Sequence, residues 1–160
     1  MLAVGSQAPE FFLPDQLGTT RSLKGAPGRW VVLWWYPRAS SRTCTLQGHA
    51  FQSLSKEFAL SGAIIYGASF NSVTENKSFA EHEQFDFPLL ADTSMKVGHA
   101  YGVTRELDDP AVNKPRRITY LIDPDQIVRQ VYVVEDAGPH PQQVLLDLRA
   151  LQGQVSRPEG

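Results

Sequence analysis

Two stretches of the chain are almost continuously apolar, and each predicts a buried β-strand. Residues 30–36 (WVVLWWY) form an unbroken run of β-branched and aromatic side chains, and residues 63–69 (AIIYGAS) are similar. Such runs are typical of strands buried on both faces of a sheet, because a strand with one wet face alternates apolar and polar positions. The sequence therefore predicts a sheet that has helices on both sides.

The segment between these two runs has the spacing of a helix. From about Thr43 onward, Leu46, Ala50, Leu54 and Phe58 fall on one stripe of a helix. A strand, a helix and a second strand in succession form a βαβ unit, in which the strands are parallel and the crossover is right-handed. The pattern therefore predicts an α/β fold.

The rest of the chain supplies a hairpin at each side of this unit and three more helices. Residues 11–23 predict an N-terminal β-hairpin, and residues 118–122 and 128–134 predict an antiparallel pair joined by a turn at residues 123–126. The remaining elements are helices over residues 72–83, 92–101 and after Pro139, with a weak strand at 87–90. This order is typical of a thioredoxin-like fold, with a central mixed sheet flanked by helices, and residues 1–160 are predicted to form a single domain.

Composition and charge exclude several classes of function. The 160 residues are 42% hydrophobic and 20% charged, with a formal net charge of -2. That balance gives no reason to expect nucleic acid or a membrane as a partner. The first residues lack the basic and apolar regions of a signal peptide, so a cytoplasmic location is expected. Because there is one cysteine, no internal disulfide can form.

That cysteine, Cys44, is the main candidate for chemistry. It follows a polar loop with two arginines, at the point where a central strand is succeeded by the first turn of a helix. Free backbone N–H groups and the positive end of the helix dipole stabilise a thiolate at such a position. A lone cysteine is more often an inert apolar side chain, and this alternative stays open. Thioredoxin-type disulfide exchange is excluded in its usual form, since there is no C-x-x-C.

Four motifs make the chain resemble the peroxiredoxins. Residues 37–44 (PRASSRTC) fit the active-site signature P-x-x-x-S/T-x-x-C, and residues 117–123 (RITYLID) fit the strand motif R-x-T-F/Y-x-I-D. Residues 87–103 and 5–11 are similar to segments of the bacterioferritin-comigratory, or PrxQ-like, branch. The motifs occur in order and extend over nearly the whole chain, which makes the resemblance specific.

The resemblance implies a role for each residue of the motif. Cys44 would be the peroxidatic nucleophile, oxidised by a peroxide to a sulfenic acid. Ser41 would hydrogen-bond the sulfur and the peroxide, and Arg117 would supply fixed positive charge to both. Pro37 would shield the sulfur from water, and the backbone N–H groups of Thr43 and Cys44 would bind the peroxide oxygens. No metal, haem, flavin or other cofactor is implied.

The chain departs from the branch at the position where many members have a second, resolving cysteine. His49 stands there, five residues after Cys44. The resemblance is therefore to a one-cysteine variant, whose sulfenic acid would be reduced by an external thiol such as thioredoxin, glutaredoxin or a small thiol. His49 is expected to be a surface residue without a role, and the alternative is a proton carrier or hydrogen-bond partner. The oligomeric state is left open between a monomer and a homodimer.

Two alternatives to a peroxidase remain. The same oxidisable thiol would also serve a peroxide sensor that turns over little, and a thioredoxin-like scaffold with an inert cysteine would need no chemistry at all. Sustained peroxide consumption with a thiol reductant would indicate the peroxidase and not the sensor. Labelling of Cys44 only after denaturation would indicate the inert scaffold. The other histidines lack metal-ligand spacing, so no metal site is predicted: these are His82, His99 and His140.

Overall fold

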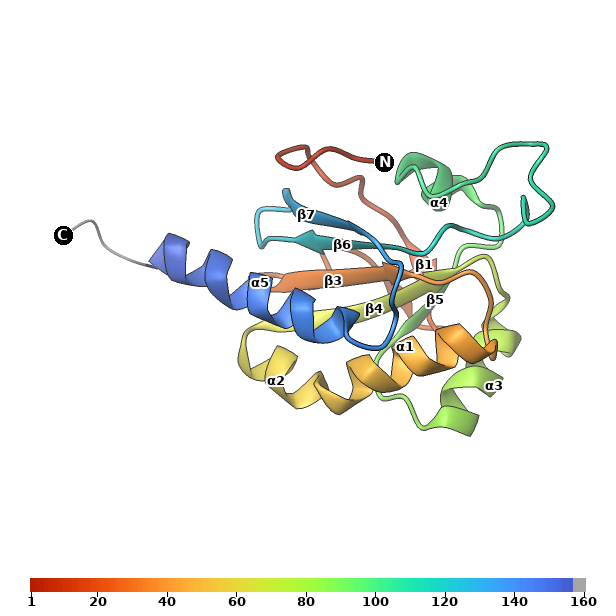
Figure 1. Ribbon diagram of the computed structural model, residues 1–160, viewed down its shortest axis with the longest axis horizontal. Coiled ribbons are helices and arrows are strands. Elements are labelled where there is room, and N and C mark those ends of the chain that lie inside the picture. The colour runs from red at the N-terminus through yellow and green to blue at the C-terminus, as the bar shows by residue number, and fades with distance from the viewer. Residues whose placement is uncertain (157–160) are drawn as a thin grey trace.

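A mixed sheet forms the centre of the molecule (Figure 1). The computed structural model describes residues 1–156. Within them the strands of this sheet lie in the order β5-β4-β3-β6-β7. Their bounds are Trp30–Trp35 for β3, Ala63–Ser69 for β4, Leu89–Ala91 for β5, Ile118–Ile122 for β6 and Val128–Val133 for β7.

The pairing of the strands confirms the predicted parallel pair, β3 with β4, and the predicted antiparallel pair, β6 with β7, whereas the order of the strands was not visible in the sequence pattern. β3 is parallel to β4, with Val32 opposite Ile65, and antiparallel to β6, with Val32 also opposite Leu121. β4 and β5 are parallel, whereas β6 and β7 form the expected antiparallel pair. Two short strands, β1 (Leu13–Pro14) and β2 (Thr20–Arg21), form the N-terminal hairpin.

Helices lie on both sides of the sheet, but unequally. Figure 1 shows α1, α2 and α3 below the sheet, α5 at the height of β3 and β4, and α4 above the sheet near the N-terminus. Side chains of α1, α2, α3 and α5 share one core on the same face of the sheet. The bounds are Arg42–Ser53 for α1, Ser55–Leu60 for α2, Val73–Glu83 for α3, Lys96–Ala100 for α4 and His140–Ser156 for α5. A capping box opens α3, with Ser72 Oγ accepting from the Glu75 N–H at 3.1 Å.

Strand β3 is buried along its whole length because it is central in the sheet. Its alternating side chains enter two separate cores. Trp34 packs against Phe51 of α1, with ring centroids 5.2 Å apart. Trp35 points to the other face, where its ring lies 6.2 Å from that of Tyr101. The strand therefore fixes the sheet between both layers, and one tryptophan contacts the helix that carries Cys44.

The predicted stripe of the helix after β3 is confirmed at its second half, where Phe58 is buried and Leu54 packs against the core, but it is wrong in the first turns. The side chains of α1 that are buried are Cys44, Gln47, Gly48 and Phe51, whereas Leu46 is 54% exposed. Gln47 and Gly48 were not part of the predicted stripe: Gln47 contacts Arg117, and Gly48 lies against the ring of Phe85. The helix also breaks at Leu54, so α1 and α2 are separate elements.

A membrane helix is not found among the described residues. No helix within residues 1–156 is both long enough and apolar enough to span a bilayer.

Candidate active site

Cys44 is the third residue of α1 and lies in its first turn. Ser41 is the N-cap residue, and the first backbone bond of the helix runs from the Thr45 N–H to the Ser41 carbonyl at 2.9 Å. The N–H groups of Thr43 and Cys44 precede that bond, so they have no acceptor within the helix. The first turn contains no acidic residue. The sulfur is therefore placed at the positive end of the helix dipole, as the sequence predicted.

Arg117 brings a permanent positive charge to the sulfur. It immediately precedes β6, the strand that pairs with β3, and its Nη2 donates to Cys44 Sγ at 3.5 Å. Its Nη1 donates to Gln47 Oε1 at 2.7 Å. The planar guanidinium thus spans two residues on one face of α1, which fixes its orientation toward the sulfur.

Gln47 is a site residue that the sequence analysis missed. It is fully buried, one helical turn after Cys44, and its Oε1 is the acceptor that orients Arg117. Its Nε2 has no hydrogen-bond partner within the described part of the chain. A buried amide at this spacing from the cysteine is a signal that the sequence contains, since such groups need partners. A glutamine on a helix is usually exposed, so its residue type alone does not indicate burial.

The structure places the other predicted residues around the same loop. Ser41 is half-buried, and its side chain makes no cap hydrogen bond, so its hydroxyl is not committed to the helix end. Pro37 is half-buried directly after Tyr36. The Thr43 side chain is exposed. Cys44 itself has a relative exposure of 0%.

The loop before α1 is fixed by polar side chains from the next strand and helix. The Ala39 N–H donates to Asn71 Oδ1 at 2.8 Å, and the Tyr36 hydroxyl donates to Asn76 Oδ1 at 2.5 Å. Burial raises the pKa of Tyr36 well above its usual range, and a negative charge on Cys44 adds to the rise. Tyr36 therefore stays a neutral donor beside the thiol.

A buried histidine lies behind Arg117. His140, at the start of α5, hydrogen-bonds Thr119 Oγ1 through Nε2 at 2.9 Å. Burial lowers the pKa of His140 to about 4, and the charge of Arg117 contributes in the same direction. His140 is therefore neutral at pH 7 and joins α5 to the strand that Arg117 precedes.

His49 points away from the sulfur. Its Nε2 lies 2.7 Å from Glu83 Oε1, and His82 Nδ1 approaches the other oxygen of the same carboxylate at 2.5 Å. These hydrogen bonds, first that of His82 and then that of His49, lower the pKa of Glu83. His49 thus has a contact between α1 and α3 that was not predicted. No group of three or more potential metal ligands occurs in the described residues.

The comparisons with known proteins agree with this geometry. The model of the AhpC/TSA family matches residues 4–131. Peroxiredoxin Bcp of Xanthomonas campestris is 35% identical over 148 residues, which are 89% of this chain and 92% of that protein. Peroxiredoxin Q of wheat (Triticum aestivum) chloroplasts is 35% identical over 128 residues, or 80% of this chain and 58% of that protein.

Solved structures give the same result for the fold. Peroxidoxin BcpB of Mycobacterium tuberculosis superposes with a TM-score of 0.86 at 35% identity, over 94% of this chain and 99% of that one. The Xanthomonas campestris bacterioferritin comigratory protein, described for its alkyl peroxide reduction activity, superposes with a TM-score of 0.83 at 31% identity, over 88% and 91%. These likenesses confirm the thioredoxin-like fold. With a family match over most of its length and relatives aligned nearly end to end, the chain belongs to the AhpC/TSA family, among peroxiredoxins of the Bcp and peroxiredoxin Q type.

Proposed function

We propose that the protein is a thiol-dependent peroxidase of the one-cysteine type, in which Cys44 is the nucleophile. The observation that supports this most directly is the contact of 3.5 Å between Arg117 Nη2 and Cys44 Sγ at the start of α1. A thiolate there is stabilised by a fixed cation and by the helix dipole. Family membership supports the peroxidase activity, and the single cysteine supports the one-cysteine type.

The reaction follows from the charges around the sulfur. The Cys44 thiolate attacks one oxygen of hydrogen peroxide or an organic hydroperoxide, forming an S–O bond and breaking the O–O bond. The leaving oxygen departs as hydroxide or alkoxide, which takes up a proton to give water or an alcohol. Arg117 and the N–H groups of Thr43 and Cys44 stabilise that developing negative charge, and Ser41 donates to the peroxide. Pro37 keeps water from the sulfur.

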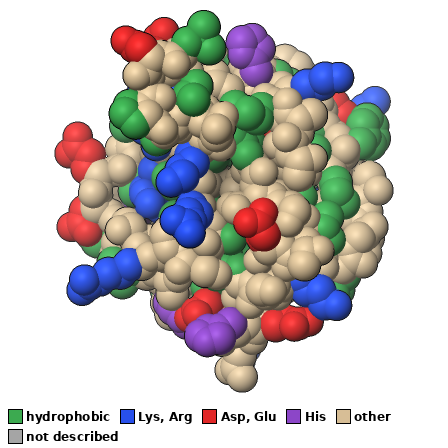
Figure 2. All heavy atoms as spheres, turned by 90° about the vertical axis from the view of Figure 1, so that its right-hand side faces the viewer, with side chains coloured by type: hydrophobic (Ala, Val, Ile, Leu, Met, Phe, Trp, Pro, Cys, Tyr) green, Lys and Arg blue, Asp and Glu red, His purple; other side chains and the backbone are tan. Residues whose placement is uncertain are grey.

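The sulfenic acid is then reduced from outside the chain. An external thiol attacks the Cys44 sulfur, releases water and leaves a mixed disulfide, and a second thiol releases Cys44 and forms the reductant's disulfide. Thioredoxin, glutaredoxin and small thiols are the candidate reductants, and a monomer or homodimer in the cytoplasm would serve equally well. The face on which α1 begins carries a cluster of basic side chains (Figure 2). We expect this cluster to attract anionic reactants.

The first experiment is stopped-flow tryptophan fluorescence of the reduced protein mixed with hydrogen peroxide. Trp34 packs against Phe51 of α1, so it is placed to report a change at Cys44. We expect a second-order signal far faster than that of free cysteine and a mass increase of one oxygen, both absent in Cys44→Ser. A rate no higher than that of free cysteine would reject the peroxidase.

A peroxide sensor with little turnover is the second candidate, favoured by the complete burial of Cys44. Burial would slow the approach of a bulky reductant more than that of a peroxide. Sustained peroxide consumption with excess dithiothreitol or with thioredoxin and its reductase separates the two, since a sensor would stop after one equivalent.

A further inference from the structure

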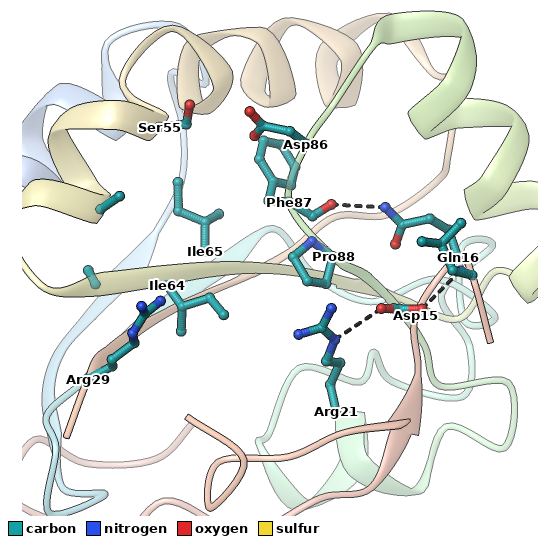
Figure 3. Close-up of a pocket in the computed structure, with 13 residues that line it drawn as sticks. Asp15, Gln16, Arg21, Arg29, Ser55, Ile64, Ile65, Asp86, Phe87 and Pro88 are labelled. Atoms are coloured by element: carbon teal, nitrogen blue, oxygen red, sulfur yellow. Dashed lines mark hydrogen bonds and ion pairs between the residues drawn. The ribbon is translucent and has the colours of Figure 1, made fainter. Parts of the chain in front are cut away.

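A pocket of about 320 Å³ lies at the end of the sheet opposite Cys44. Cys44 follows the carboxyl end of β3, whereas the pocket adjoins the first half of β4, which runs parallel to β3. Its walls come from the β1–β2 hairpin, Arg29, α2, residues 63–65 and residues 86–88 (Figure 3). The peroxidase chemistry proposed above does not use this pocket.

An unpaired strand edge borders the pocket. β5 pairs only with Gly67, Ala68 and Ser69 of β4, and the Gly67 N–H donates to the Pro88 carbonyl at 3.0 Å. The backbone N–H and C=O of one residue in a strand point to the same side, and residues two apart share that side, so those of Gly67 face the same side as those of Ile65. Within residues 1–156 no strand pairs with it on that side. One donor and one acceptor are therefore left for a ligand.

Arg21 is oriented by a buried carboxylate. Its Nε donates to Asp15 Oδ2 at 3.0 Å, and Asp15, which is 2% exposed, also accepts from the N–H groups of Leu17 and Thr19 at 2.9 and 3.0 Å. The negative charge of Asp15 is thus already engaged. Figure 3 shows the terminal nitrogens of Arg21 directed into the pocket.

Arg29 provides a second cation that has no partner. Its guanidinium makes no hydrogen bond or ion pair with any other described residue, and in Figure 3 it and Arg21 lie on either side of Ile64. Burial raises the pKa of Tyr66, and the positive charges of Arg21 and Arg29 each lower it. The two guanidinium groups therefore lie near the Tyr66 hydroxyl. The remaining charged group of the lining, Asp86, is exposed and lies on the other side of β4.

We propose that this pocket binds a small organic carboxylate that carries an amide and a short apolar group, as an N-acyl amino acid does. The carboxylate lies between Arg21 and Arg29, the amide pairs with the Ile65 peptide group, and the apolar group packs on Ile64 and Pro88. The volume is within the range of small-molecule sites, roughly 300 to 1,000 Å³. Two cations suit a carboxylate because each guanidinium offers paired donors.

The test uses N-acetyl-L-leucine as the probe and the amide resonances of the isotope-labelled full chain as the readout. We expect saturable shifts of Ile65 and its neighbours, with a Kd of about 1 mM or lower. N-acetyl-L-leucinamide, which lacks the charge, should bind at least about tenfold more weakly. Arg29→Gln should weaken binding of the acid by at least about fivefold, whereas Lys24→Gln, an exposed cation outside this pocket, should leave it unchanged.

The control for charge within the pocket is Asp86→Asn, which removes a negative charge from the lining. The affinity for N-acetyl-L-leucine should be unchanged or higher in this variant. The proposal is overturned by the absence of saturable shifts up to about 10 mM probe, or by equal binding of the acid and the amide. Unchanged binding in Arg29→Gln would also overturn it. The peroxide rate of Cys44 should be the same in Arg29→Gln as in the unmodified protein, so this result is independent of the proposed peroxidase.

Discussion

Under the proposed chemistry, Arg117 and Gln47 decide how the sulfur is presented to an oxidant. Complete ionisation of a thiol with an ordinary pKa of about 8.5 raises its thiolate fraction at pH 7 by only about thirtyfold. An acceleration beyond that must come from charge stabilisation on the leaving oxygen. The guanidinium lies within 3.5 Å of the sulfur, so it is placed to provide both effects.

The Arg117→Ala variant separates these two contributions. We expect its rate with hydrogen peroxide to fall by about a hundredfold or more, because both thiolate and transition-state stabilisation are lost. Its rate with iodoacetamide, which depends on the thiolate alone, should fall by about thirtyfold at most. Stopped-flow kinetics with both reagents provide the measurement. Equal losses toward the two reagents would show that Arg117 acts only on the thiolate.

Gln47 is predicted to act through Arg117 as a positioning residue. Gln47→Leu removes the acceptor that holds Nη1 at 2.7 Å, and we expect the peroxide rate to fall by about tenfold, the equivalent of one hydrogen bond to a charged group. Alkylation by iodoacetamide should fall less. The matched control is Gln142→Leu, the same change at an exposed glutamine of α5, which should leave the rate unchanged. A Gln47→Leu protein with normal peroxide kinetics would contradict the role.

At the scale of the element, α1 depends on close packing against the residues that follow α3. A methyl group on Gly48 would lie 2.4 Å from Cζ of Phe85, which is itself packed against Phe79 and Phe87. We expect Gly48→Ala to lower the free energy of unfolding by about 1–3 kcal/mol, measured by urea denaturation. The control, Gly153→Ala, has nothing within 4 Å and should stabilise its helix slightly. A Gly48→Ala protein as stable as that control would show that Phe85 can move aside.

The elements also show what sequence patterns can and cannot predict. The strand before Cys44 and the position of the thiol in a helical turn followed from local residue types, and both are confirmed. Phe58 and Leu54 of the predicted stripe pack in the core as expected, but the buried positions within α1 were wrong because a glutamine and a glycine are buried there. Only their partners, Arg117 and Phe85, explain why. Those partners come from distant segments, which a local pattern does not contain.

At the scale of the whole molecule, His140 joins three elements. It begins α5, hydrogen-bonds Thr119 of β6 and packs its ring against Phe51 of α1, with centroids 5.9 Å apart. Sequence spacing excluded a metal role for this histidine but gave no sign of its burial. Its placement depends on how α5 packs across the sheet, which no local pattern shows.

The buried histidine should make the stability of the protein pH-dependent. The pKa of His140 is about 4 in the folded protein, against about 6.5 when unfolded, so the unfolded chain takes up a proton first as the pH falls. Stability should therefore be complete above pH 6.5 and decrease by up to about 3 kcal/mol between pH 6.5 and 4. Urea denaturation across this range provides the measurement. His140→Gln should lack this part of the loss, and an identical pH profile in that variant would contradict the assignment.

The complete burial of Cys44 has a consequence for timing under the proposed chemistry. A peroxide is small enough to enter through brief fluctuations of the loop, whereas a protein thiol needs the first turn of α1 to move aside. The forward and return halves of the cycle would then have different temperature and viscosity dependences. During a burst of oxidant, oxidation would outpace reduction, so the fraction of oxidised protein would reflect the total amount of peroxide encountered. After the burst this fraction would decline at a rate set by the opening of the first turn of α1.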